Sequence, residues 1–324
     1  MEVVDLGTLD GRGVSEATDV NTRGIIVGWS ETVVEGAQFV RAVQWEDDEP
    51  TALGSLREDG LGDTDATGIN ARGTVVGSAQ DSDWNWNAVQ WVDDEPERLE
   101  ARSGESRSRD SHATDVNARG TVVGHFDDGD SEVRAFQWTE RDGMVSLGTL
   151  RDDETGRSVA TAVDDDGTIV GYSVGNDGRT HAFQWTKREG MTDLGTLSGD
   201  GSSAAFDVQT GAVVGWYAED GEFANRTTTR WDGETLDSIG TFRVDNTGYS
   251  QAYGVAGDVV VGASQVDAGG SHAFVWVDDR LIDLGTLSND DTGQSSAAAA
   301  NVQGRVVGWS QVDGGNNHAV RWTW

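Results

Sequence analysis

The sequence predicts an all-β fold, a seven-bladed β-propeller with four antiparallel strands in each blade. Three observations support this prediction: a repeat of about 46 residues, four short strand-like segments in each repeat, and an extra copy of the fourth segment at the start of the chain. Repeats of roughly 40 to 50 residues with four strands each are typical of propeller blades. We therefore expect a single domain over residues 1–324.

Two markers define the repeat independently. The first is the glycine of a Val-Val-Gly or Ile-Val-Gly phrase, and its copies are 44 to 49 residues apart: Gly28, Gly77, Gly124, Gly171, Gly215, Gly262 and Gly308. The second is a tryptophan, with copies 45 to 47 residues apart: Trp45, Trp91, Trp138, Trp185, Trp231, Trp276 and Trp322. The units span about 3–50, 51–96, 97–143, 144–190, 191–234, 235–280 and 281–324.

The four segments of the first unit are 17–21, 25–30, 41–45 and 52–56. They are rich in Val, Ile, Phe, Trp and Thr, which fit a pleated surface, and glycine-rich or acidic turns separate them. None of the units shows a sustained 3.6-residue period, so the sequence predicts no helix. The last unit supplies only three segments. We expect residues 3–9 to pair with the strand that ends at Trp322 and so close the ring without exposed edges.

The phrase Leu-Gly-Thr-Leu recurs at the fourth segment of most units. We expect it to form the outermost strand, with its glycine allowing the tryptophan of the same blade to lie across the backbone. The second unit lacks the phrase: the chain after Trp91 is polar and leads into a Ser/Arg/Asp-rich stretch. This blade edge should be the weakest part of the ring.

Acidic residues dominate the composition. The formal net charge is −34, and Lys187 is the only lysine. Such a charge destabilises a compact chain in dilute salt, and molar salt screens it because the Debye length falls to roughly 3 Å. We therefore predict a protein of an extreme halophile that needs high salt. Phosphate binding requires a basic surface, so nucleic acid is not an expected partner.

Other classes are excluded more directly. There are no cysteines, so disulfides and thiolate metal sites are ruled out. No apolar run is long enough for a membrane span, and no signal peptide precedes the first strand-like segment. We expect a cytoplasmic or virion-associated protein, with an extracellular setting as the alternative.

The units resemble the HAF repeat of bacteria and archaea, named after His-Ala-Phe. That tripeptide stands at 181–183 and 272–274, and a close variant stands at 318–320. The stretch 66–77, ATGINARGTVVG, also fits the family pattern. The resemblance covers nearly the whole chain and implies a propeller-like fold that is often extracellular. It carries no known catalytic residues.

No motif for catalysis, metal binding or a cofactor emerges. His181, His272 and His318 share one repeat position, where other units have arginine, asparagine or threonine, so we interpret that position as structural. Copies of one position should be spread around a ring rather than converge on a metal. His112 and His125 have no evident histidine partner in the sequence. We therefore expect no metal, no cofactor and no enzyme activity.

The candidate binding residues are aromatic residues in polar loops. Trp84 and Trp86 lie in the loop 81–87 with Asp83, Asn85 and Asn87, and two tryptophans one residue apart can point to one side of an extended segment. Stacking on a sugar or docking a protein would explain such exposure, and local packing would explain it equally well. Tyr217 and Phe223 in a second loop are weaker candidates.

The sequence thus predicts a non-enzymatic binding module that contacts a protein or a surface glycan through the loops of one rim. It could be a virion or cell-surface component. The alternatives are a structural module of a larger assembly and a propeller-fold hydrolase or lyase.

Overall fold

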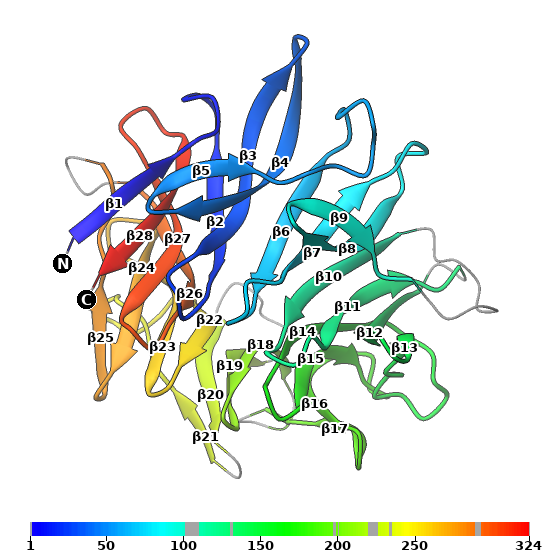
Figure 1. Cartoon of the computed structure of the whole chain (residues 1–324). Coiled ribbons are helices and arrows are strands. Elements are labelled where there is room, and N and C mark those ends of the chain that lie inside the picture. The colour runs from blue at the N-terminus through cyan, green and yellow to red at the C-terminus, as the bar shows by residue number, and fades with distance from the viewer. Residues whose placement is uncertain are drawn as a thin grey trace.

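Seven four-stranded antiparallel sheets make up the chain in a computed structural model (Figure 1). The structure describes residues 2–323 apart from 101–109, 130–131, 197–198, 200, 220–225, 233–234 and 289–292. No α-helix occurs among these residues. Each sheet is one blade, and the seven blades form a ring, so the predicted seven-bladed propeller is confirmed.

Each blade from one to six contains four consecutive strands. Blade one has β2 (Ser15–Val20), β3 (Ile26–Val34), β4 (Ala37–Glu46) and β5 (Glu49–Ala52). Blade two has β6 (Thr64–Ile69), β7 (Val75–Gln80), β8 (Trp86–Val92) and β9 (Glu95–Arg98). Blade three has β10 (Ser111–Val116), β11 (Val122–Asp127), β12 (Val133–Thr139) and β13 (Gly143–Ser146).

The remaining blades follow the same order. Blade four has β14 (Ser158–Val163), β15 (Ile169–Val174), β16 (Thr180–Thr186) and β17 (Gly190–Asp193). Blade five has β18 (Ser202–Gln209), β19 (Ala212–Ala218), β20 (Thr227–Asp232) and β21 (Thr235–Ser238). Blade six has β22 (Ser250–Ala256), β23 (Val259–Gln265), β24 (Ser271–Val277) and β25 (Arg280–Asp283).

Blade seven joins the two ends of the chain. It consists of β26 (Ser295–Ala300), β27 (Arg305–Gln311), β28 (Asn317–Thr323) and the N-terminal strand β1 (Glu2–Gly7). β1 pairs with β28, with Val3 opposite Trp322. The N and C labels accordingly lie close together in Figure 1. The predicted ring closure by the N-terminal strand is therefore confirmed.

The Val-Val-Gly glycine is required by a β-bulge that recurs in every blade. The register between the first two strands shifts at this point, for example between Ala17 and Asp19 in blade one. A Cβ atom on Gly28 would lie 2.0 Å from the carbonyl oxygen of Glu16, and the other six glycines meet the same obstacle. No other residue fits there, which explains why the phrase marks the repeat so regularly.

The role predicted for Leu-Gly-Thr-Leu is wrong. In blade one the outermost strand ends at Ala52, and Leu-Gly-Ser-Leu follows it as the exit toward the next blade. Gly7, Gly148 and Gly285 have φ between 67° and 81°, and a Cβ there would meet nothing within 4 Å. The glycine is therefore needed for a left-handed backbone and not for contact with an aromatic ring. The tryptophan comes from the following blade: Trp45 Nε1 donates to Leu6 O at 3.0 Å.

A hydroxyl group joins every pair of neighbouring blades. The side chain at the start of each inner strand accepts a backbone N–H from the third strand of the preceding blade, as Ser15 does from Ala319. The other six acceptors are Thr64, Ser111, Ser158, Ser203, Ser250 and Ser295. Apolar clusters fill the space between blades, and one of them packs Leu6 of blade seven against Val43 and Trp45 of blade one.

The second blade has a regular outer edge, contrary to its degenerate sequence. β9 pairs with β8 over four residues, and Leu99 is buried where other units bury the first leucine of their phrase. A single leucine at the right position therefore suffices to anchor this strand.

The seven inner strands contact one another in sequence and surround a central channel. Thr18, Thr67, Thr114 and Thr161 each donate to a carbonyl oxygen of the next inner strand, at 2.9 to 3.0 Å. Asp19, Asp115 and Asp207 each accept a backbone N–H of the next blade at 2.8 Å. These side chains are half-buried although they lie at the centre of the molecule.

Candidate functional site

The loop 81–85 is a tight turn built around Asp81. Its carboxylate oxygen Oδ1 accepts the backbone N–H groups of Asp83 at 2.9 Å and Asn85 at 3.1 Å. The backbone N–H of Trp84 donates to Asp81 O at 3.0 Å, and Trp84 has φ 64°. The turn is thus fixed by its own hydrogen bonds, and it holds Trp84 in a left-handed conformation.

Trp84 is exposed and partly stacked. Its side chain is 56% exposed, and it is the only aromatic residue among the exposed large hydrophobic residues that the structure describes. The guanidinium of Arg57 lies over the ring, 4.5 Å from its centroid, and Asp59 holds that guanidinium through a hydrogen bond of 2.9 Å. Such a cation–π contact fixes one face of the ring and leaves other surface free.

Trp86 points elsewhere, so the expectation that both tryptophans share one side is wrong. Its ring lies 5.5 Å from that of His112 in blade three, and its backbone N–H donates to Asp110 Oδ1 at 2.8 Å. The expectation assumed an extended segment, and the left-handed backbone at Trp84 breaks that alternation. The Trp84 side chain thus lies on the rim, whereas the Trp86 side chain lies against His112 on the inner strand of the next blade.

The polar members of the loop divide into two groups. The Asn87 side chain forms hydrogen bonds within the loop: its Nδ2 donates to Asn85 O at 2.8 Å and to Asp81 Oδ2 at 3.3 Å. Asp83 is exposed and Asn85 is half-buried beside Trp84 in the turn. Asp83 and Asn85 therefore remain the polar groups available next to the exposed ring.

The second predicted loop is not joined to the first. Tyr217 is half-buried in β19 of blade five, three blades away from Trp84, and burial, followed by the nearby Glu219, raises its pKa. Phe223 lies outside the described residues. The structure therefore gives no single surface that contains both loops.

A second cluster, which we call the channel cluster, lies on the inner strands. Glu16, Asp65 and His112 occupy the same repeat position in three consecutive blades. Directly opposite them on the second strands are Trp29, Ser78 and His125, in the same order. Neighbouring inner strands contact each other around the channel, which brings His112 of blade three against Ser78 of blade two.

The histidines of this cluster are held as neutral rings. Ser78 Oγ lies 3.0 Å from His112 Nδ1, and the rings of His112 and His125 stack at 5.1 Å. Burial lowers the pKa of His125 to about 4, with further contributions from His112 and Arg157. His125 Nδ1 is buried without a hydrogen-bond partner among the described residues. The sequence-based expectation that these two histidines lack histidine partners is wrong.

The carboxyl groups of the cluster are shifted toward the protonated form. Burial raises the pKa of Glu16 to about 7 and that of Asp65 to about 6. Asp65 Oδ1 has no hydrogen-bond partner among the described residues. Both acids can therefore donate or accept a hydrogen bond near neutral pH. Ser78 is 1% exposed, so its hydroxyl is not within reach of a substrate as a nucleophile.

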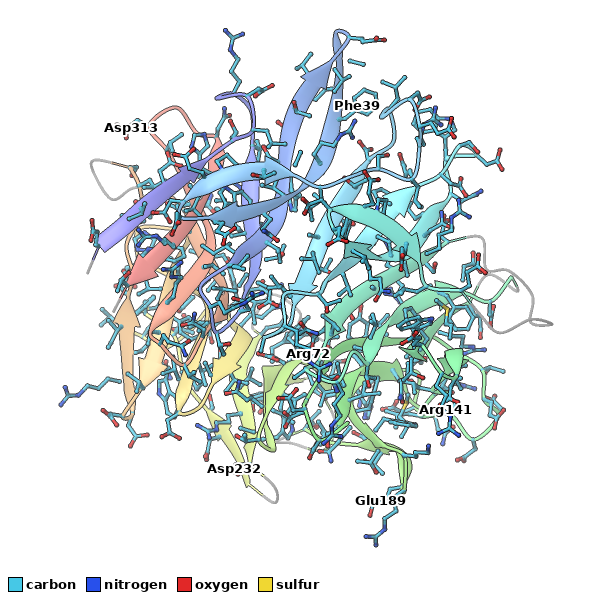
Figure 2. The ribbon with its side chains drawn as sticks, in the orientation of Figure 1. Phe39, Arg72, Arg141, Glu189, Asp232 and Asp313 are labelled. Atoms are coloured by element: carbon cyan, nitrogen blue, oxygen red, sulfur yellow. The ribbon has the colours of Figure 1, made fainter. Side chains whose placement is uncertain are left out.

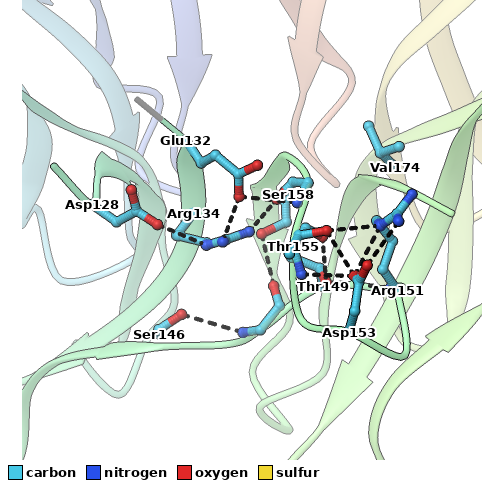
Figure 3. A network of polar contacts seen from close by, with 12 residues as sticks. Asp128, Glu132, Arg134, Ser146, Thr149, Arg151, Asp153, Thr155, Ser158 and Val174 are labelled. Carbon is cyan, nitrogen blue, oxygen red and sulfur yellow. Dashed lines mark hydrogen bonds and ion pairs between the residues drawn. The ribbon is translucent and has the colours of Figure 1, made fainter. Parts of the chain in front are cut away.

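The histidine position of the outer strands is structural, as the sequence predicts. His181, His272 and His318 each pair through Nδ1 with an aspartate of the adjacent outer strand, at 2.7 to 2.9 Å: Asp193, Asp283 and Asp5. Blade three has Arg134 in this position. Arg134 binds Asp128 at 3.0 Å and Glu132 at 2.6 Å, and it also donates to Gly156 O (Figure 3).

Figure 3 also shows a hydrogen-bonded turn in the loop after this blade. Arg151 binds both carboxylate oxygens of Asp153, at 3.0 and 2.9 Å, and Thr155 donates to the same carboxylate at 2.7 Å. Equivalent arginine–aspartate turns occur at Arg57 and Arg243. These arginines are occupied by the protein itself and do not form a ligand site.

Among the residues that the structure describes, no group of three or more His, Asp or Glu side chains is placed to hold a metal ion. Likewise, the described part of the chain contains no helix long and apolar enough to cross a membrane.

Comparison with known proteins supports the fold and no more. No family model matches the chain, and no curated protein matches it, so the resemblance to the HAF repeat stays a prediction. A solved structure described as TolB from Agrobacterium tumefaciens is 13% identical, with 70% of this chain and 80% of that chain covered and a TM-score of 0.50.

Two other solved structures illustrate how varied the similar proteins are. A puromycin-hydrolysing peptidase of Mycobacterium tuberculosis is 12% identical, with 79% of this chain and 44% of that chain covered and a TM-score of 0.49. A lectin of Aleuria aurantia bound to a fucoside is 12% identical, with 84% and 93% covered and a TM-score of 0.40. At these levels the comparison indicates a shared fold class, and function has to be argued from this chain's own residues.

Proposed function

We propose that this protein is a non-enzymatic binding module that recognises a glycan through the rim surface around Trp84. The observation that supports this function is the exposed Trp84 ring on a turn that its own hydrogen bonds already fix. Because the turn is ordered before binding, little conformational entropy is lost when a ligand stacks on the ring. The resemblance to the HAF repeat implies a frequently extracellular setting, and we include a cell-surface or virion role in this proposal.

The chemistry around the ring fits a sugar better than a charged ligand. A sugar presents C–H groups to an aromatic face and hydroxyl groups to its edge, and Asp83 and Asn85 lie next to Trp84 as acceptors and donors. Arg57 already occupies one part of the ring surface and is itself paired with Asp59. Stacking and neutral hydrogen bonds also persist in molar salt, where ionic attraction is screened.

The test is a glycan-binding assay in molar KCl with the variant Trp84→Ala. Trp84 is exposed, so its melting temperature should stay close to the parent's, whereas binding should weaken by about tenfold or more, as expected for the loss of an aromatic stacking contact. Val302→Ala, an exposed residue on a turn outside this loop, serves as the control and should bind like the parent. Parent-like binding by Trp84→Ala would refute the assignment, and unfolding would show that Trp84 is a packing residue.

One observation favours a second candidate function, a hydrolase or lyase that uses the channel cluster. Glu16 and Asp65 combine raised pKa values with half-open positions on the channel, which is what a general acid requires. The variants Glu16→Gln and Asp65→Asn would abolish such an activity and leave glycan binding at Trp84 unchanged. A panel of glycosidic and ester substrates would separate the two functions.

A further inference from the structure

Arginines of blade one and of blade seven line a cavity at the junction between these two blades. The cavity has a volume of about 340 Å³. Its charged lining consists of Arg23, Glu46, Asp47 and Asp48 of blade one with Arg305 and Arg321 of blade seven. It lies on the side of the ring that carries the turns between the first and second strands, where Arg72 is labelled near the centre of Figure 2. The volume is within the range of small-molecule sites.

We call this cavity the junction cavity. Only some of its charged side chains are paired with other groups of the protein. Arg321 binds Asp48 through both nitrogens, Nε at 2.6 Å and Nη2 at 2.7 Å, and lowers the pKa of that carboxyl. Arg305 donates one N–H to Gly24 O at 2.7 Å. Arg23 donates its backbone N–H to Asn21 Oδ1 at 2.9 Å, but its guanidinium has no hydrogen bond or ion pair among the described residues, although acidic residues outnumber basic ones by 57 to 23 in the chain. Arg23 and Arg305 therefore retain free donors.

Arg305 also departs from the repeat. The equivalent residues of the other six blades are uncharged: Ile25, Thr74, Thr121, Thr168, Ala212 and Val259. A charge at this position is therefore not needed to build a blade. The departure falls at the junction that holds this cavity, which points to a ligand with a negative group.

The arrangement of the charges restricts the ligand further. Arg305 is half-buried, whereas Glu46 and Asp47 are exposed at the turn that borders the cavity. A simple anion would have to pass these carboxylates in the field of a protein with net charge −34. A zwitterion has no net charge, and its ammonium group would meet the carboxylates while its carboxylate met the guanidinium groups. We infer that the junction cavity binds a small zwitterion of the amino-acid or short-peptide class.

Equilibrium dialysis in molar KCl with three matched dipeptides tests this inference. Alanyl-alanine carries both charges, its N-acetylated form carries only the carboxylate, and its C-terminal amide carries only the ammonium group. We expect saturable binding of the zwitterion at millimolar concentration and binding of the other two that is at least about tenfold weaker, because each lacks one charge-assisted contact. No saturable binding of the zwitterion, or equal binding of either analogue, would overturn the inference.

The repeat itself supplies a matched control variant. Arg23 and Arg72 occupy the same position in neighbouring blades, and only Arg23 lines the cavity. Arg23→Gln should weaken dipeptide binding about tenfold without changing the melting temperature, since the Arg23 guanidinium makes no described hydrogen bond or ion pair, whereas Arg72→Gln should leave binding unchanged. Equal loss in both variants would assign binding to general surface charge and contradict a site in the cavity.

Discussion

His125 lies where two physical effects keep an imidazole neutral, and its titration should be visible in stability. Its pKa is about 4 in the folded chain because of burial, followed by the neighbouring His112 and Arg157, against 6.5 when unfolded. The unfolded chain therefore binds more protons between these values, so the free energy of unfolding falls as the pH falls from 6.5 to 4. The loss is at most about 3 kcal/mol.

The variant His125→Phe isolates this effect. It keeps a ring of similar size and cannot take up a proton, so its stability relative to the parent should increase as the pH falls from 7 to 4. Denaturant unfolding at several pH values measures this difference. The comparison is needed because burial raises the pKa values of Glu16, Asp19, Asp115 and Asp207, and these groups therefore stabilise the fold as the pH falls. A difference that does not change with pH would show that His125 is not buried as a neutral ring.

At the same scale, the sequence predicted some residue roles and missed others. The outer histidine position was correctly predicted as structural. The position of its aspartate partner varies with it: an aspartate stands there only in the three blades that carry the histidine. The other four blades have Ala52, Arg98, Ser146 and Ser238 at the position of the aspartate. The channel cluster was missed because repeat spacing gives the order of blades and not the distance between them. Ser78 and His112 are 34 residues apart and touch only because inner strands crowd around the channel.

At the scale of an element, each blade depends on the hydroxyl group at the start of its inner strand. Ser158 is fully buried; its Oγ accepts the N–H of Ala135 at 2.9 Å and donates to Gly148 O at 2.7 Å. Ser158→Ala removes both hydrogen bonds and leaves a buried N–H unsatisfied, so we expect a loss of about 1 to 3 kcal/mol in unfolding free energy.

Chemical denaturation of Ser158→Ala measures this loss. Ser238→Ala is the matched control, because Ser238 is an exposed serine at the end of β21, and it should unfold like the parent. If both variants unfold alike, the hydroxyl group does not hold neighbouring blades together.

Strand existence was predictable, whereas strand ends were not. Segments rich in Val, Ile, Phe, Trp and Thr, separated by turn residues, identified all four strands of a blade, but the outermost strand was predicted too late in the sequence because Leu-Gly-Thr-Leu has the composition of a strand. The left-handed glycine within it, for example Gly148 at φ 81°, is what ends the strand. Backbone φ angles of this kind cannot be distinguished in sequence from the glycines that serve a bulge, such as Gly171.

At the scale of the whole molecule, the structure reveals a period of two blades that the single-blade spacing concealed. The channel aspartates Asp19, Asp115 and Asp207 belong to blades one, three and five, and each reaches the next blade where a small residue stands: Gly68, Ala162 or Gly254. The arginine–aspartate turns follow the same three blades. The ring is therefore built as three blade pairs and a seventh blade, which the two ends of the chain complete.

Ring closure should govern the stability of this assembly. Deleting residues 1–9 would leave β28 as an open edge and remove Leu6, which is buried against Trp45. We expect a sharply lower melting temperature, measured by circular dichroism, and recovery when a peptide of residues 1–9 is added. The same peptide with Val3 and Leu6 replaced by aspartate should not restore it. An unchanged melting temperature after the deletion would contradict the role of β1.

The net charge of the molecule should make its stability depend on the salt concentration. The chain carries 57 acidic and 23 basic residues, and the described ion pairs, such as Arg57–Asp59 and Arg321–Asp48, occupy only a small share of the acidic side chains. The rest repel one another in the folded state more than in the expanded chain, and salt reduces this repulsion because the Debye length falls from roughly 10 Å at 0.1 M to roughly 3 Å at 1 M. We therefore expect a cooperative unfolding transition in molar KCl that weakens markedly near 0.1 M.

Thermal unfolding followed by circular dichroism at both salt concentrations measures this dependence. Tetramethylammonium chloride at equal ionic strength separates screening from any effect of potassium itself. Equal stability at both concentrations would show that the acidic surface is not an adaptation to salt, and stability restored by potassium alone would show that specific cation binding, rather than screening, holds the ring together.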